Sequence, residues 1–158
     1  MRVIAIDPGY DRCGVAILQR GAKGEELLYS ACITTTKEKT FSERLAQVMG
    51  EVRAVIEMHT PTEMALERLF FNKNQKTAMM VAEIRGALMG LGAELNLEVH
   101  EYTPGQVKVA VTGDGRSDKR QVAFMAQKLL RIQKKGLKDD EYDAMAVGIT
   151  HLAHRGRN

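Results

Sequence analysis

The sequence lacks several features that would assign it to a special class of protein. It has only two cysteines, Cys13 and Cys32, and no C-x-x-C pair, so a cysteine-based metal site is not expected. No apolar stretch approaches the roughly 20 residues that span a bilayer. The first residues run into a charged turn and lack a signal-peptide profile, which predicts a cytoplasmic protein. Because that compartment disfavours disulfides, both cysteines are expected to be buried thiols.

The composition is that of a globular protein. Hydrophobic residues make up 44% of the 158 residues, which excludes a disordered chain. There is no internal repeat and no long linker, so residues 1–158 are expected to form a single domain. The net charge of +3 is modest, but between Arg116 and Lys138 the only acid is Asp118. The basic residues of that segment are Arg116, Lys119, Arg120, Lys128, Arg131, Lys134, Lys135 and Lys138. Such a segment suits a polyanionic partner, although a solvated helix face with a lysine-rich loop would have the same composition.

Apolar runs predict five strands. Residues 2–6, 13–18 and 27–33 are joined by short turns that contain glycine, which predicts an antiparallel meander. Residues 64–67 and 97–102 each follow a helical segment. A crossover of that kind joins parallel strands, so these two are expected to run parallel to their partners.

Helical periodicity accounts for most of the remaining chain. A capping box at Thr40 and Glu43 opens an amphipathic helix that Pro61 stops. The other helices are expected from Gln75 to Leu91, from Thr103-Pro104 to Val111, after a Ser117 cap, and from Lys138 or Asp139 to Ala153. This order predicts an α/β fold: a mixed five-stranded sheet, three antiparallel strands followed by two parallel ones, flanked by helices on both faces.

Four acidic residues occupy positions where carboxylates can converge. Asp7 ends the first strand and Glu67 ends the fourth, so parallel pairing of these strands would place the two side by side. Asp140 and Asp143 share one face of the last helix and could meet the same edge of the sheet. Like charges are costly to bury unless a cation lies among them, and Mg²⁺ prefers oxygen ligands. A pair of such ions can hold both oxygens of a phosphodiester displacement, which predicts a metal-dependent nuclease.

Each acid also has a structural interpretation. Asp7 could cap the turn at Pro8-Gly9, and Asp140 could be a helix N-terminal acid favoured by the macrodipole. Their joint occurrence with Glu67, which lies in an apolar strand where an unpaired charge is costly, favours the metal site.

Four segments, in order along the chain, carry a resemblance to a known family. They are Ile6-Asp7-Pro8-Gly9, Glu67-Arg68-Leu69-Phe70 with Lys73-Asn74 after it, Gln106-Val107-Lys108, and the closing run from Tyr142 to His151. Together they resemble the bacterial RuvC Holliday-junction resolvases of the ribonuclease-H-like superfamily. The resemblance implies a ribonuclease-H-like fold and an endonuclease that resolves four-way DNA junctions in recombination and repair. Paired symmetric nicks would leave 5′-phosphate and 3′-hydroxyl ends.

The resemblance also implies roles for individual residues. The metal ligands would be Asp7, Glu67, Asp140 and Asp143, with two Mg²⁺ ions that Mn²⁺ could replace, and Asp139 competes with Asp140 for its place. The DNA-binding residues would be Phe70, Lys73, Lys108 and Lys119, with Phe70 stacking on bases near the strand exchange point and Lys119 also catalytic. The basic segment adds Arg116 to the expected DNA-binding residues through phosphate contact. The implied partners are a second copy of the chain and the RuvA-RuvB branch-migration complex.

Several residues keep alternatives open. Arg68 and Phe71 depart from the family pattern, which leaves the cutting preference undefined, and a Phe70-Phe71 pair by itself would more often be core. His151 lies about two helical turns beyond Asp143 and is expected to be structural or to support the site indirectly. The small residues Ala78, Gly86, Ala87 and Gly90 could face a second subunit or the chain's own sheet.

Three other functions compete with this interpretation. Asp7, Gly9 and Gly14 fit the D-x-G-x-x-x-x-G pattern of actin-like ATPases, but 158 residues leave no room for their two large lobes. A nuclease acting on RNA–DNA hybrids would use similar carboxylates. In a catalytically silent junction-binding protein, the basic face would bind DNA and the acids would serve only the fold.

Overall fold

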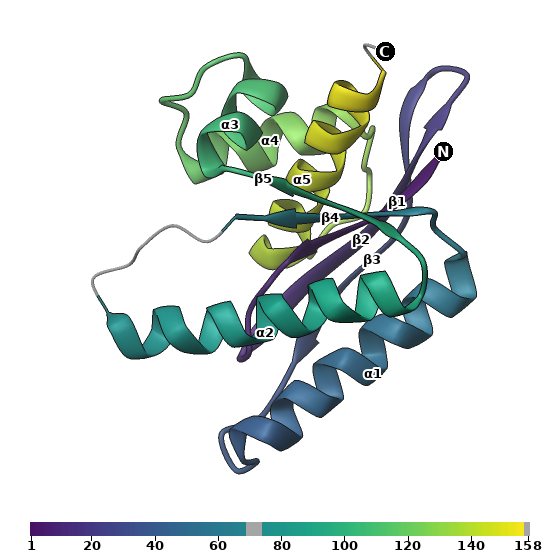
Figure 1. The fold of residues 1–158 in the computed structure, drawn as a ribbon. Coiled ribbons are helices and arrows are strands. Elements are labelled where there is room, and N and C mark those ends of the chain that lie inside the picture. The colour runs from purple at the N-terminus through teal and green to yellow at the C-terminus, as the bar shows by residue number, and fades with distance from the viewer. Residues whose placement is uncertain (69–73, 157–158) are drawn as a thin grey trace.

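A computed structural model describes residues 1–68 and 74–156, which form five strands and five helices (Figure 1). The strands are β1 (Arg2–Asp7), β2 (Arg12–Gly21), β3 (Gly24–Thr34), β4 (Glu63–Glu67) and β5 (Glu98–Tyr102). The helices are α1 (Phe41–His59), α2 (Gln75–Glu94), α3 (Pro104–Thr112), α4 (Lys119–Leu129) and α5 (Asp139–Arg155). No helix within these described ranges is both long enough and apolar enough to cross a membrane.

The strands form one mixed sheet in the order β3-β2-β1-β4-β5. The β1–β2 and β2–β3 pairs are antiparallel, whereas β4 runs parallel to both β1 and β5. The predicted fold class is therefore confirmed. Ile6 of β1 pairs with Leu66 of β4, so the residues that follow them, Asp7 and Glu67, end adjacent parallel strands at the same edge of the sheet.

Helices cover the sheet on both faces, as Figure 1 shows, with α1 and α2 on one side and α3, α4 and α5 on the other. Successive side chains of a strand point to opposite faces. In β1, Ile4 and Ile6 enter the core beneath α1 and α2, and Val3 and Ala5 enter the core beneath α5. All four are fully buried, which fixes the register of this central strand from both sides.

The helix caps follow the sequence with one correction. Thr40 and Thr103 both form the expected capping boxes, with Pro104 in the first turn of α3. The N-cap of α4 is Asp118 rather than the predicted Ser117, and its side chain accepts a hydrogen bond from the backbone of Gln121. Ser117 is instead buried, with its hydroxyl 2.7 Å from that of Thr112, so it closes the preceding turn.

The structure decides between the two alternatives for two of the small residues of α2. Gly86 and Gly90 are exposed, and an added Cβ at either would meet no atom within 4 Å. Close packing of α2 on the sheet occurs instead at Gly92, where a Cβ would lie 2.9 Å from the sulfur of Met64. The two glycines Gly86 and Gly90 therefore do not face the chain's own sheet.

Candidate active site

Asp7 and Glu67 form the strand half of the site. Both are partly buried, and they line one pocket together with Pro8 and Pro104. Their proximity follows from the parallel pairing of β1 with β4, which carries both carboxylates to the same edge of the sheet. This is the edge at which open α/β sheets bind ligands.

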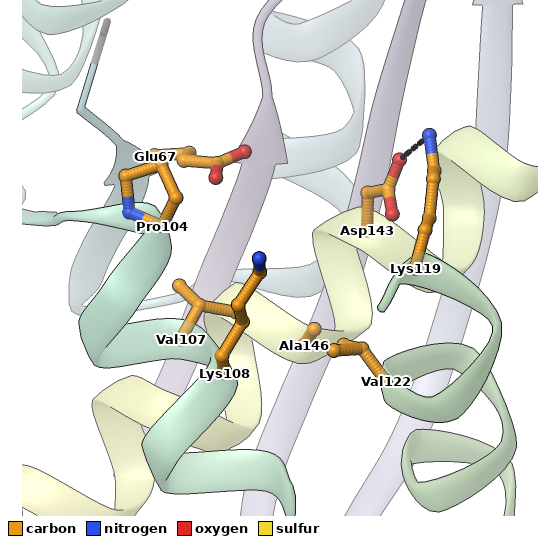
Figure 2. A pocket seen from close by; sticks show the side chains of 8 residues that line it. All are labelled: Glu67, Pro104, Val107, Lys108, Lys119, Val122, Asp143 and Ala146. Atoms are coloured by element: carbon orange, nitrogen blue, oxygen red, sulfur yellow. Dashed lines mark ion pairs between the residues drawn. The ribbon is translucent and has the colours of Figure 1, made fainter. Parts of the chain in front are cut away.

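The first turn of α5 contributes the helix half. Asp140 contacts two residues from neighbouring strands: the Arg12 Nε lies 3.3 Å from its Oδ2, and the Cys32 sulfur lies 3.8 Å from the same oxygen. Asp143 pairs with Lys119 from the start of α4, with 2.8 Å between Nζ and Oδ2 (Figure 2). Of the two cysteines, only Cys13 is fully buried as predicted; Cys32 is half-buried because it lies beside Asp140 at the site.

The four carboxylates repel one another strongly. Burial, and then the charges of Asp143, Glu67 and Asp140 in decreasing order of importance, together raise the pKa of Asp7 to about 8. Burial likewise raises the pKa of Glu67, with Asp143 contributing. It also raises the pKa of Asp143, although the hydrogen bond from Lys119 opposes that effect. A cation placed among these groups would relieve the repulsion. Because the donors are carboxylate oxygens, they fit a hard ion such as Mg²⁺.

Two lysines extend toward the same opening. Lys108 of α3 and Lys119 of α4 line a pocket together with Glu67 and Asp143 (Figure 2). The hydrogen bond to Asp143 raises the pKa of Lys119, so this ammonium remains charged at neutral pH. The pocket thus presents carboxylates and ammonium groups together, with Asp143 and Lys119 paired on one wall and Glu67 across from them (Figure 2), an arrangement that suits a phosphate group bound next to a metal ion.

Two further predicted residues, Arg116 and Asp139, are exposed. Arg116 is exposed in the connection between α3 and α4 and pairs with Asp114, and it does not line the pocket. Asp139, the competitor of Asp140, is exposed at the start of α5. Phe70 and Lys73, as well as Phe71, lie outside the described residues.

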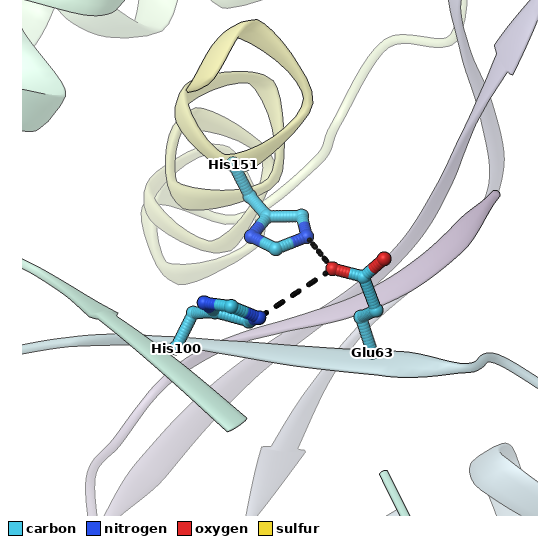
Figure 3. A group of neighbouring side chains, drawn as sticks. All are labelled: Glu63, His100 and His151. Carbon is cyan, nitrogen blue, oxygen red and sulfur yellow. Dashed lines mark hydrogen bonds and ion pairs between the residues drawn. The ribbon is translucent and has the colours of Figure 1, made fainter. Parts of the chain in front are cut away.

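A second polar cluster was not predicted from the sequence. Glu63 of β4, His100 of β5 and His151 of α5 each place one potential ligand atom within 4.8 Å of the others, so their geometry could hold a metal ion (Figure 3). The cluster is at the opposite end of β4 from Glu67. Only His151 was singled out in the sequence, as a structural or supporting residue, and no spacing signal pointed to its partners.

Hydrogen bonds within this cluster already satisfy His151. Burial lowers the pKa of His151, which keeps the imidazole neutral. Its Nε2 donates to Glu63 over 2.7 Å, so its Nδ1 accepts from the Tyr102 hydroxyl over 2.9 Å. Burial acts to raise the pKa of Glu63, but the hydrogen bond from Arg155 and the contact with His151 outweigh it, and the net pKa is lowered. The Arg155 guanidinium occupies the Glu63 carboxylate, and both imidazole nitrogens of His151 are hydrogen-bonded. We therefore assign this cluster a structural role in the fold and not a metal-binding one.

Comparison with known proteins identifies the family. The chain matches the family model described as crossover junction endodeoxyribonuclease RuvC over residues 3–151. The curated RuvC of Moorella thermoacetica is 41% identical over 153 residues, covering 97% of this chain and 92% of that protein. The structure of Thermus thermophilus RuvC matches with a TM-score of 0.90 and 28% identity, covering 99% of this chain and 96% of that one.

A second Thermus thermophilus RuvC structure, in complex with a Holliday junction substrate, also has a TM-score of 0.90, with 25% identity over 100% of this chain and 97% of that one. The family consists of metal-dependent nucleases. On the family match and on these relatives, the chain belongs to the RuvC family of crossover junction endodeoxyribonucleases.

Proposed function

We propose that this protein resolves four-way DNA junctions by paired symmetric nicks in opposing strands, during homologous recombination and repair. The observation that carries the proposal is the meeting of Asp7, Glu67, Asp140 and Asp143 at one edge of the sheet, next to two lysines. Family membership supports the substrate, since the similar Thermus thermophilus protein has been solved with a Holliday junction.

Two Mg²⁺ ions, or Mn²⁺ in their place, are the cations that these carboxylates would hold. The environment of Asp7 supports this, because burial and three neighbouring carboxylates together raise its pKa, and a bound cation would relieve both effects. When bound, such ions activate a water for in-line attack on a phosphodiester and stabilise the leaving 3′ oxygen. Products would carry 5′-phosphate and 3′-hydroxyl ends.

The chain's own residues contribute charge and position. Asp143 holds the Lys119 ammonium at the edge of the pocket, where it can neutralise charge that develops on the phosphate in the transition state. Lys108 faces the same pocket from α3 and can hold a neighbouring phosphate. Arg116, being exposed, would add backbone affinity farther from the reacting bond.

Phe70 and Lys73 would extend the DNA-binding surface from the segment that follows β4. Phe70 comes three residues after Glu67 in the sequence, so base stacking by this side chain would take place close to the cutting site. We expect it to enter the opened crossover, which would distinguish a junction from a continuous duplex.

Paired nicks require two active sites, and we propose that a homodimer provides them. The exposed glycines Gly86 and Gly90 on α2 support close approach of a second helix, since within residues 1–68 and 74–156 no atom would contact a Cβ added at either position. Sedimentation should give a mass of about twice the 17.6 kDa chain, and a monomer at micromolar concentration would count against the dimer. We also propose that the protein docks to a RuvA-RuvB branch-migration complex and acts in the cytoplasm, where bacterial DNA lies.

A cleavage gel tests the substrate. A four-way junction, a linear duplex of the same sequence, a single strand and an RNA–DNA hybrid are each incubated with the protein in Mg²⁺, and product ends are tested for sealing by DNA ligase. We expect symmetric, ligatable nicks in the junction and little cutting of the other three. Efficient cutting of the hybrid with an intact junction would replace this proposal with a hybrid nuclease, and 3′-phosphate ends would contradict the proposed chemistry.

A further inference from the structure

Gly14 of β2 lies directly beneath the first turn of α5. A Cβ placed on Gly14 would lie 1.9 Å from the carbonyl oxygen of Asp140 and 2.6 Å from its carbonyl carbon. Both are backbone atoms, so no rotation of a side chain could relieve the clash. The helix therefore rests on this strand at a point where any residue other than glycine would displace it.

The local conformation does not explain this glycine. Gly14 is a buried residue in the middle of the extended strand β2, paired in regular antiparallel register with β1 and β3. A glycine inside a strand weakens it, and such a position often marks a place where another backbone approaches closely. Here the approaching backbone is that of Asp140.

The position of Gly14 connects it to the candidate active site. Its partner across the β1–β2 ladder is Asp7, so Asp140 is held above the strand residue that lies beside Asp7. The side chain of Asp140 is held by Arg12 of the same strand, β2, and by Cys32 of the adjacent strand β3. Contact with the sheet thus fixes both the backbone and the carboxylate of Asp140.

We propose that Gly14 is a positioning residue for the metal site: its missing side chain lets α5 rest on β2, which brings Asp140 close enough to Asp7 for both to bind the same cation. The inference depends on the proposed role of these carboxylates as metal ligands. A methyl group at position 14 would push the Asp140 backbone outward. The displacement would continue until the carbonyl carbon and carbonyl oxygen of Asp140 lie about 3.5 Å from the methyl carbon. Mg²⁺ binds at about 2.0–2.1 Å in near-ideal octahedral geometry, so a displacement of that size is poorly tolerated.

The test is the variant Gly14→Ala, with Gly50→Ala as the matched control because a Cβ at Gly50, exposed on α1, would meet nothing within 4 Å. Two quantities are measured: Mn²⁺ affinity of the DNA-free protein by calorimetry, and the Mg²⁺ concentration for half-maximal junction cleavage. We expect Gly14→Ala to weaken Mn²⁺ binding and to raise the Mg²⁺ requirement at least about tenfold, with junction affinity in EDTA unchanged. Gly50→Ala should match the parent in all three measurements.

A rescue experiment separates positioning from general damage to the fold. In the Gly14→Ala background, Asp140→Glu adds one methylene and should recover part of the Mn²⁺ affinity, whereas in the parent background the same change should weaken it. If Gly14→Ala does not fold, the single variant Asp140→Glu tests whether the position of the Asp140 carboxylate is fixed. An unchanged Mg²⁺ requirement in that variant would mean that it is not, and would overturn the inference. A Gly14→Ala protein with the parent's metal affinity would overturn the inference, while a parent that binds no Mn²⁺ and cuts no junction would instead remove the proposed function.

Discussion

Asp7 is the residue on which the fold exerts the largest electrostatic effect. Burial and three neighbouring carboxylates raise its pKa to about 8, so in the absence of a cation it holds a proton near neutral pH. A bound metal ion displaces that proton, and metal affinity should therefore fall as the pH falls below about 8. The sequence predicted Asp7 as a ligand from its place at the end of a strand, but the size of the pKa shift depends first on how deeply the fold buries Asp7 and then on how closely the other carboxylates approach.

The pH dependence of stability follows from the same shift. Asp7 has an ordinary pKa of 3.8 in the unfolded chain and a raised one in the folded chain, so the folded state binds more protons in between. The contribution of Asp7 to the stability of the metal-free protein is therefore expected to fall as the pH rises from about 4 to about 8. Glu67 and Asp143, whose pKa values are also raised, act in the same direction.

Asp7→Asn should remove most of this dependence. Each pKa unit by which the folded and unfolded chains differ corresponds to about 1.4 kcal/mol of stability. Because the pKa of Asp7 is raised from 3.8 to about 8, the variant in EDTA at pH 8 should be more stable than the parent by about 1.4 kcal/mol or more. At pH 4, where Asp7 is protonated and neutral, the two should unfold alike. Urea titrations at both pH values measure the difference, with exposed Asp139→Asn as the control. A difference in stability between Asp7→Asn and the parent that does not grow from pH 4 to pH 8 in EDTA would contradict the assignment.

At the level of elements, β4 and α5 lie side by side, with a hydrogen bond between them at one end and a shared pocket at the other. From Glu63 to Glu67, β4 rises about 13 Å. From Asp143 to His151, α5 rises about 12 Å. The hydrogen bond between Glu63 and His151 therefore holds the strand and the helix together at one end, and their carboxylates Glu67 and Asp143 line the same pocket at the other.

His151→Phe tests the strength of that connection. The phenyl ring fills a similar volume but leaves Glu63 and the Tyr102 hydroxyl without their partner in the core. We expect a loss of about 2–4 kcal/mol in the free energy of unfolding by urea. The control is His154→Phe, an exposed position on the same helix, which should change stability by less than about 0.5 kcal/mol. Equal stability of the two variants would mean that the buried network contributes little.

Local sequence signals were enough to predict most element boundaries. Contacts between residues far apart in the sequence could not be predicted from them. Thr40, Thr103 and Pro104 predicted helix starts because capping acts within one turn. Ser117 was wrongly predicted as the N-cap of α4. Its hydroxyl instead hydrogen-bonds with that of Thr112, a contact that depends on how α3 ends and that the local sequence does not reveal. The Glu63–His151 pair spans 88 positions of sequence, so no local pattern could reveal it.

Over the whole molecule, charge is distributed unevenly although the net charge is only +3. Carboxylates gather at the ends of β1 and β4, and lysines from α3 and α4 border them. The basic segment of the sequence, from Arg116 to Lys138, was predicted as a DNA-binding face. Only Lys119 of that segment lines the acidic pocket, because the turn between α3 and α4 directs Arg116 to solvent, where it pairs with Asp114.

Salt dependence of junction binding measures these phosphate contacts. Lys108→Ala and Lys119→Ala should each weaken junction binding and reduce the slope of log affinity against log salt by about 1. Lys39→Ala serves as the control, since Lys39 hydrogen-bonds Gln47 near the start of α1 and lines no part of the pocket. Binding should be measured in Ca²⁺ or EDTA, so that cleavage does not intervene. A slope that stays unchanged in both variants would place the DNA on another face.

The most direct test of the metal site is junction cleavage in Mg²⁺ by Asp7→Asn and by Asp139→Asn. Both changes remove one carboxylate with little change of shape, but only Asp7 lies among the converging acids, whereas Asp139 is exposed at the start of α5. We predict that Asp7→Asn lowers the cleavage rate at least about 1,000-fold, because metal-assisted catalysis supplies several kcal/mol, while junction affinity is kept. Asp139→Asn should cut at close to the parent rate. Equal cleavage by Asp7→Asn and the parent would contradict the assignment of these carboxylates as the catalytic metal site.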